Sequence, residues 1–360
     1  MCYAQLVGLI LTELQKTNML IFTLRRFSLF FLTLLLLTML SFSLSFLFPG
    51  DQLINLTGQI SASPEQLAVL ADEYQQQSGL LGQYVSYLKH LFQGDMGYSM
   101  TSHLPISSEV LNRLPATVEL ASVALLVAMF VGIPIGFCAA IYHRKVPDNL
   151  ILTIAMIGYS IPVFWLGILA ILLFSIQLGW LPSSGQISLL FEIQHITGLQ
   201  LVDILLSDSP YKWQAFHDAT RHLILPVIVV ALAPATIFMR LARSAMLEVL
   251  DTHYIKAAKA KGLTFSQIIY RHAMRNAIIK VIRDIGLQFA NLITIAMVTE
   301  VIFSWPGIGS WLIESISQRD YTAIQGGLIV LSCFIFIVHM IIDLVYAALN
   351  PLAREPRHGT

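Results

Sequence analysis

Six apolar runs, each long enough to cross a lipid bilayer as a helix, limit the fold of this chain more than any other feature. A transmembrane helix needs about 20 mostly apolar residues, because the hydrocarbon core of a bilayer is about 30 Å thick. The runs cover residues 27–48, 117–141, 150–176, 222–240, 281–303 and 324–349. The sequence therefore predicts an all-α integral membrane protein with six transmembrane helices.

Composition agrees with this class. Of the 360 residues, 56% are hydrophobic and only 12% are charged, which would leave a soluble protein too little polar surface. The net charge of zero and the absence of a basic tail give no reason to expect a nucleic acid partner. Cys2, Cys138 and Cys333 lie far apart and form no ligand or disulfide pattern.

The positive charges predict the orientation. The 21 Lys and Arg residues divide unequally between the two sides of the membrane. Only five lie on the side opposite the termini, and these are Lys89, Arg113, Lys212, Arg221 and Arg319. Because Lys and Arg concentrate in cytoplasmic loops, both termini are expected in the cytoplasm. Arg25 and Arg26 could also open a signal peptide, but the run after them exceeds the roughly 7–15 residues of a signal h-region.

The densest positive charge lies in residues 240–283, called the basic segment below. Helix-forming residues run from Met246 to Lys261, Gly262 interrupts them, and a second amphipathic run begins near Phe265. Glycine commonly closes a helix because it adopts the left-handed conformation without steric cost. The pattern predicts a helix, a glycine turn and another helix, with Ala257 and Ala258 leaving one face flat enough for another protein. An ordinary basic loop is the alternative.

Several residues inside the runs break the regular pattern. Gly132, Gly136 and Ala140 favour close packing of helices. Pro162, in SIPVFWLG with Trp165, predicts a break in the helix at membrane depth. Such a break could lie beside a translocation path, because the backbone groups that it frees are tolerated where protein or water satisfies them. Pro115 and Pro105 are expected at helix starts, Pro134 at a bend, and Pro226 and Pro234 at interruptions of the fourth run.

Ionisable residues near membrane depth are functional candidates because their burial is costly. They are Glu119, Asp284, Glu300, His339 and Asp343. Glu300 could act near an outer gate or make a structural hydrogen bond, and His339 could pair with Asp343 one turn away. In the long insert of residues 177–221, Asp218 and His222 would share a helix face, but a metal site would need more ligands than this, so none is predicted.

No enzyme signature is present. The chain lacks the G-x-x-x-x-G-K-[ST] phosphate loop, the H-E-x-x-H metal motif and the G-x-S-x-G nucleophile turn. It is therefore not expected to be an enzyme or to bind a cofactor. If ATP drives its function, separate subunits must hold ATP and Mg.

Three segments together resemble the permease subunits of bacterial ATP-binding-cassette importers, specifically the dipeptide and oligopeptide branch. They are AAKAKG with RHAMRNA, YLKHLFQGDMGYSMTSHLPISSEVLNRLPATVEL, and TEVIFSWPGIGSWLIESISQRDYTAIQGG, at residues 257–262 with 271–277, 87–120 and 299–327. The first resembles the loop that docks into the ATPase subunit. Lys256 departs from the glutamate frequent in the family, and Lys280 and Arg283 depart from its proline.

The resemblance implies a type I importer permease fold and two sets of functional residues. Those expected in the ATPase-coupling loop are Tyr254, Ala257, Ala258, Gly262, Arg271, His272 and Asn276. Those expected in the translocation path or gate are Pro162, Trp165, Glu300, Trp305, Pro306 and Gly307. The implied partners are a second related permease, two cytoplasmic ATP-binding subunits and a periplasmic solute-binding protein, within membrane lipid.

The same resemblance implies a domain organisation. We expect an N-terminal extension, a first transmembrane helix, a periplasmic segment, a permease domain of five spans with the coupling loop at 240–283, and a cytoplasmic tail. Their bounds are 1–18, 19–48, 49–116, 117–350 and 351–360. Because the resemblance begins at Met19, an upstream start codon would explain the extension.

Residues 197–212, TGLQLVDILLSDSPYK, resemble the permeases of Sap peptide transporters. This implies transport of peptides across the bacterial inner membrane, including cationic antimicrobial peptides and hence resistance to them. Export of the polyamine putrescine is an alternative. A stand-alone secondary transporter, which would respond to an ion gradient, and a membrane enzyme, which would need a polar catalytic cluster, are the alternatives from other classes.

Overall fold

The computed structural model describes residues 24, 27–60, 63–74, 79–282 and 284–349, and its described elements are helices. Five of them are long and apolar enough to cross a membrane: Phe27–Leu47, α5 (Ile106–Ile141), α9 (Lys212–Leu250), α13 (Ile285–Ile302) and α15 (Tyr321–Leu349). A sixth span is a bent pair, α6 (Val146–Ser160) with α7 (Val163–Ala170) and its continuation η1 (Ile171–Gln177). The predicted all-α fold is confirmed, and the number of spans is the expected six when the bent pair is counted as one span. The expected extension 1–18, Arg25, Arg26, Arg283 and the tail 351–360 lie outside the described residues, as does the Asp343 side chain.

The described part of the chain forms two compact units, of which one comprises the described residues up to 106 together with residues 320–349. Its short helices are α2 (Gln52–Thr57), α3 (Pro64–Glu73) and α4 (Leu80–Phe92). They pack with the first span and α15 around a core that includes Phe42, Leu56, Tyr87 and Ile329. Burial of such side chains contributes about 1.5–3 kcal/mol each where they leave water.

Asp320 ties two of the sequence motifs together within this unit. Its fully buried carboxylate accepts hydrogen bonds from Ser99 Oγ at 2.5 Å and from Thr101 Oγ1 at 2.9 Å. It also accepts from the backbone N–H of Ala323 at 3.0 Å, in the first turn of α15. Segments 87–120 and 299–327 are thus joined by a carboxylate that satisfies a helix start.

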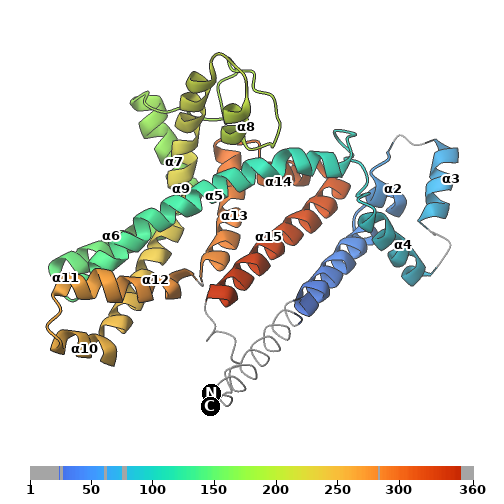
Figure 1. Ribbon diagram of the computed structural model, residues 1–360. Helices are drawn as coiled ribbons and strands as arrows, with labels where there is room; N and C mark the ends of the chain where they lie inside the picture. The colour runs from blue at the N-terminus through green and yellow to red at the C-terminus, as the bar shows by residue number, and fades with distance from the viewer. Residues whose placement is uncertain (1–23, 25–26, 61–62, 75–78, 283, 350–360) are drawn as a thin grey trace, which may run out of the picture. The chain divides into compact units, whose positions relative to one another are not determined.

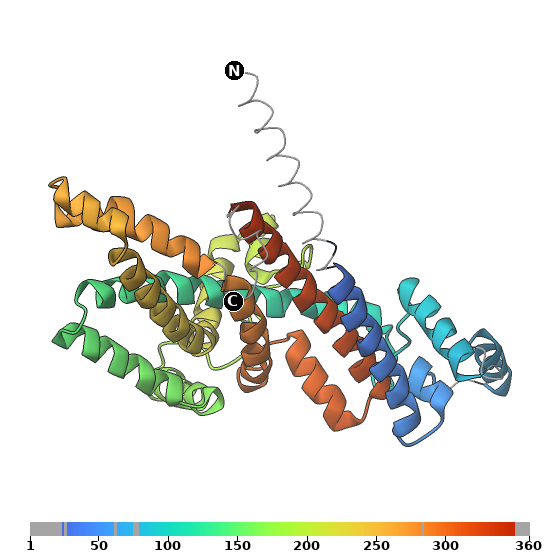
Figure 2. The same cartoon turned by 90° about the horizontal axis from the view of Figure 1, so that it is seen from below.

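The second unit, residues 107–319, holds the remaining elements. They are α5, α6, α7, η1, α8 (Gln200–Leu206), α9, α10 (His253–Ala260), α11 (Phe265–Gln267), η2 (Ile268–Ala273), α12 (Met274–Ile282), α13 and α14 (Ile308–Gln318). Figure 1 shows α8 and α10 toward opposite ends of this unit, with α9 running between them. Figure 2 shows the same elements from below.

Close packing of α5 on α9 confirms the role expected for the small residues. A Cβ atom at Gly136 would lie 2.3 Å from the Met239 carbonyl oxygen, and one at Gly132 would lie 2.4 Å from that of Ala235. Only glycine fits at such a distance, so the two backbones meet as they do at other small-residue contacts between membrane helices.

Three proline expectations were wrong. Pro115 lies inside α5 rather than at a helix start, and Pro226 and Pro234 lie inside α9 without ending it. Neighbouring helices and side chains can satisfy the backbone groups that a proline frees in a membrane helix. α9 therefore continues well beyond the expected run of 222–240 in both directions.

Candidate coupling and translocation sites

The basic segment forms the helix, glycine turn and helix that its sequence predicts. Gly262, at φ +82°, follows α10, and its N–H donates to Lys259 O at 3.0 Å while that of Leu263 donates to Ala258 O at 3.3 Å. This pair of bonds is the Schellman motif, in which a left-handed residue closes the helix. The expected continuous helix from Met246 to Lys261 was wrong, because α9 ends at Leu250 and α10 begins after Thr252.

The two arms of this segment are held together by buried isoleucines and one side-chain hydrogen bond. Ile255 of α10 and Ile268 and Ile269 of η2 are at most 2% exposed. Asn276 Nδ2 of α12 donates to the Tyr254 hydroxyl oxygen at 2.8 Å, which joins two residues expected in the coupling loop. The arms therefore form one small structural element.

Its outer surface carries apolar and cationic side chains. Tyr254, Phe265 and Tyr270 are 44%, 57% and 72% exposed. Ala257 and Arg271 are also exposed, whereas Ala258 and His272 are half-buried. Exposed aromatic side chains on a compact element are typical of surfaces that contact another protein.

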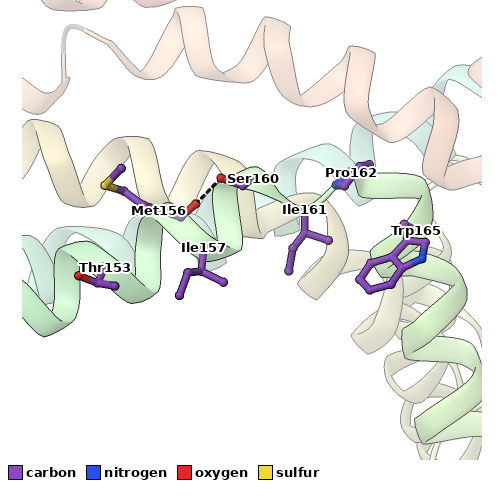
Figure 3. A pocket seen from close by; sticks show the side chains of 7 residues that line it. All are labelled: Thr153, Met156, Ile157, Ser160, Ile161, Pro162 and Trp165. Atoms are coloured by element: carbon purple, nitrogen blue, oxygen red, sulfur yellow. Dashed lines mark hydrogen bonds between the residues drawn. The ribbon is translucent and has the colours of Figure 1, made fainter.

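Pro162 and Trp165, two candidates for the translocation path, line one pocket at the bend between α6 and α7 (Figure 3). The two helices meet at 94°, and Pro162 is the residue before α7 begins. The pocket has a volume of about 860 Å³, and its other lining residues are Thr153, Met156, Ile157, Ser160 and Ile161. Ser160 Oγ donates to Met156 O at 2.8 Å, one turn back along α6, so its hydroxyl is bonded within its own helix.

Glu300 lies in a separate, fully buried cluster. Thr117 Oγ1 of α5 donates to Glu300 Oε1 at 2.6 Å, and the Ser310 N–H of α14 donates to Oε2 at 2.9 Å. The Thr117 hydroxyl also accepts from the Ile308 N–H at 2.9 Å. Glu300 could act near a gate or make a structural hydrogen bond, and the structure shows the hydrogen bond. Through it the carboxylate connects α5, α13 and the start of α14.

Trp305 and Gly307 belong to this same cluster. Trp305 is 2% exposed and its Nε1 donates to the Ala116 carbonyl oxygen at 3.0 Å. A Cβ atom at Gly307 would lie 2.3 Å from the Glu300 carboxyl carbon, so the turn needs glycine there. Pro306, between them, is exposed. The six candidates for the path or gate thus occupy two distinct places.

Three carboxylates organise the insert 177–221 through backbone N–H and hydroxyl donors that sequence reasoning did not identify. Glu119 of α5 accepts from the N–H groups of Gln200 and Leu201 at 3.1 and 2.8 Å, at the start of α8. Asp218 accepts from Ser188 N at 2.7 Å and lies on the same face of α9 as His222, as expected. No three His, Cys, Asp or Glu side chains in the described part of the chain could together hold a metal ion.

Asp203 is the third of these carboxylates. Burial is the strongest influence on its pKa and raises it, but hydrogen bonds from Thr197, Ile196 and Gly198 together outweigh burial and leave the pKa lowered. The closest are Thr197 Oγ1 at 2.6 Å and Thr197 N at 2.7 Å from Oδ1. The ionised form therefore holds the loop before α8 in place.

The fold and these sites define a multi-pass membrane component of a transporter. Residues 132–355 match the binding-protein-dependent transport system inner membrane component family, and residues 19–121 match the N-terminal part of such a component. The first match covers more than half of the chain, so the chain belongs to this family of inner membrane permease subunits. Such subunits are not themselves enzymes.

Known proteins of similar sequence are transport permeases. The di/tripeptide transport system permease protein DppB of Pseudomonas aeruginosa is 41% identical over 94% of this chain and 100% of its own length. SapB of Escherichia coli is 43% identical over 94% of this chain and 98% of its own length. SapB is named a putrescine export permease in strain K12 and a peptide transport permease in O157:H7.

A solved structure shares the fold. An inward-facing form of the MetNI methionine ABC transporter contains a chain that aligns with a TM-score of 0.51 at 15% identity. The alignment covers 67% of this chain and 96% of that one. The likeness supports the type I importer permease fold.

Proposed function

We propose that this chain is the translocation subunit of an ATP-driven peptide transporter in the bacterial inner membrane. The proposal rests on family membership together with one observation: the basic segment is a compact element whose exposed Tyr254, Phe265 and Tyr270 suit a protein partner. A second related permease, two cytoplasmic ATP-binding subunits that hold ATP and Mg, and a periplasmic solute-binding protein complete the transporter. Both termini lie in the cytoplasm in this arrangement.

The mechanism is alternating access. Closure of the ATPase subunits displaces α10 and the turn at Gly262, and the displacement changes the spans that line the path. Pro162 and Trp165 are the path residues, because they line the pocket at the bend. Glu300, Trp305 and Gly307 fix the turn before α14, and Pro306, which that turn exposes, is the gate candidate.

Gly262→Asp tests the coupling role. The substitution puts a charged side chain on the proposed docking surface at a residue whose φ is +82° and whose Cβ would meet nothing within 4 Å. The complex should still assemble and hydrolyse ATP, but transport should be lost. Gly94→Asp is the matched control, because Gly94 has the same φ of +82° and equally open surroundings but lies outside the basic segment. Normal transport by Gly262→Asp would contradict the coupling role.

The substrate is tested by transport with the complete complex in proteoliposomes, with ATP on the ATPase side. Labelled cationic peptide and labelled putrescine are offered in parallel. Peptide moving toward the ATPase side supports the proposal, whereas putrescine moving away from it supports the export function that the name of one relative carries. Transport by this chain alone, driven by an ion gradient and not by ATP, would favour a secondary transporter.

A further inference from the structure

A two-point ion pair, with a buried carboxylate and a partly exposed arginine, joins α9 to the start of α6. Arg243 Nε lies 2.7 Å from Asp148 Oδ1, and Arg243 Nη2 lies 2.7 Å from Oδ2. The Asp148 side chain is only 1% exposed. An arginine that binds a carboxylate through two parallel hydrogen bonds fixes the orientation of the partner as well as its distance.

The turn between α5 and α6 adds further contacts to this carboxylate. The backbone N–H of Arg144 donates to Asp148 Oδ2 at 2.9 Å, and His143 Nδ1 lies 3.0 Å from Arg243 Nη2. Arg144 has φ +62°, a conformation that residues other than glycine seldom adopt. The shape of the turn is therefore imposed by its contacts with Asp148 and Arg243.

The pair also occupies a particular place in the chain. Arg243 lies in the last two turns of α9, which ends at Leu250 and leads directly into α10. Asp148 lies in the first turn of α6, whose other end is the bend at the pocket of Pro162 and Trp165. The ion pair thus connects the helix that carries the basic segment to the span that lines the pocket.

We propose that Arg243 and Asp148 are positioning residues that transmit movement of the basic segment to α6, and so to the bend at Pro162. The inference rests on the proposed coupling function. A two-point contact on a buried carboxylate fixes the relative orientation of the two helices and can transmit a rotation, whereas a single exposed contact contributes little.

The chain supplies its own controls. Lys256 Nζ lies 2.9 Å from Asp251 Oδ1, and Lys280 Nζ lies 2.6 Å from Glu248 Oε1. The side chains of the Lys256 and Asp251 pair are 56% and 86% exposed. Exposed pairs of this kind contribute little. Asp251→Asn therefore removes a carboxylate charge from the same part of the chain without touching the buried pair.

The test measures distances between spin labels in the complete complex, in lipid nanodiscs, without nucleotide and after trapping with ATP and vanadate. Cys2, Cys138 and Cys333 are first replaced by serine. Leu189→Cys, on the fully exposed tip of the insert, is the reference position. Lys259→Cys reports on α10, and Ile157→Cys, 60% exposed, reports on α6.

Two distances are measured, from the label at residue 189 to the label at residue 259 and from the label at residue 189 to the label at residue 157. In the complex without further substitution, both distances should change on trapping. In Asp148→Asn the change at Lys259 should remain and the change at Ile157 should be lost, with ATP hydrolysis retained and transport abolished. Arg243→Lys keeps the positive charge but cannot make the two-point contact, so it should lose part of the change at Ile157. This variant replaces Asp148→Asn in the test if the complex with Asp148→Asn does not assemble. Asp251→Asn should alter neither distance change.

A further comparison separates transmission from the effect of an unpaired buried charge. The double variant Asp148→Asn, Arg243→Gln should lose the change at Ile157 as completely as Asp148→Asn alone, because the pair acts as one unit, whereas a recovered change would assign the loss to the unpaired Arg243 charge. An unaltered change at Ile157 in Arg243→Lys and in the double variant would overturn the inference and leave the coupling function standing. No change at Lys259 in the unsubstituted complex would instead overturn the coupling function, and the inference with it.

Discussion

Thr117→Val probes the buried cluster around Glu300 with almost no change in shape. The Thr117 hydroxyl donates to Glu300 Oε1 at 2.6 Å and accepts from the Ile308 N–H at 2.9 Å, and the side chain is fully buried. Valine replaces the hydroxyl by a methyl group, which leaves both partners without that contact. Each buried group deprived of its partner costs about 1–3 kcal/mol, so the free energy of unfolding should fall by about 2–6 kcal/mol.

The measurement is equilibrium unfolding in mixed detergent and SDS micelles, followed by tryptophan fluorescence. Trp305, 2% exposed within the cluster, should be a local reporter of its loss. Thr294→Val is the matched control, because Thr294 lies on α13 as Glu300 does, but its hydroxyl is exposed and bonds only to Ala290 O of its own helix. If Thr117→Val destabilised the protein no more than Thr294→Val does, the hydrogen bonds of Glu300 would not hold these three helices together.

Two other substitutions address glycine and pH. Gly307→Ala would place its Cβ 2.3 Å from the Glu300 carboxyl carbon and should lower the midpoint of thermal unfolding, whereas Gly79→Ala, with nothing within 4 Å of its Cβ, should not; equal midpoints would refute the steric reasoning. Because the pKa of Asp203 is lowered in the folded protein, the stability that it contributes is present above the unfolded pKa of about 3.9 and is lost as pH falls through the folded value. A dye on Leu189→Cys should therefore report loosening of the insert at acid pH, and Asp203→Asn should remove that transition; an unchanged acid transition would assign it to another group.

The sequence predicted those features that depend on the length of apolar runs and on local backbone geometry. Membrane thickness sets the length of a span, so five of the six runs correspond to single long helices and the third corresponds to the bent pair of α6 and α7. Gly262 was predictable because glycine is the residue that most often adopts the left-handed conformation at the end of a helix. Gly132 and Gly136 were predictable as a packing face, although the sequence did not identify α9 as the helix they contact.

The contacts between distant residues were not predictable. Asp148 and Arg243 are 95 positions apart, and Thr117 and Glu300 are 183 apart, so no periodic pattern relates them. Glu300 stood out because a carboxylate at membrane depth is costly, but that cost says nothing about which donor relieves it. The predicted interruptions at Pro226 and Pro234 were wrong for a similar reason. α9 continues through both prolines in surroundings that only the folded chain provides.

The length of α9 connects two distant parts of the chain through one helix. At about 1.5 Å per residue, its 39 residues extend about 58 Å, roughly twice the thickness of the hydrocarbon core. Near one end its Asp218 holds Ser188 of the insert, and at the other it leads into α10. A tilt of the whole of α9 by about 4° around its midpoint would move its two ends about 2 Å in opposite directions. A displacement of the insert at Asp218 would therefore be accompanied by a displacement of the basic segment, because both are attached to the same helix.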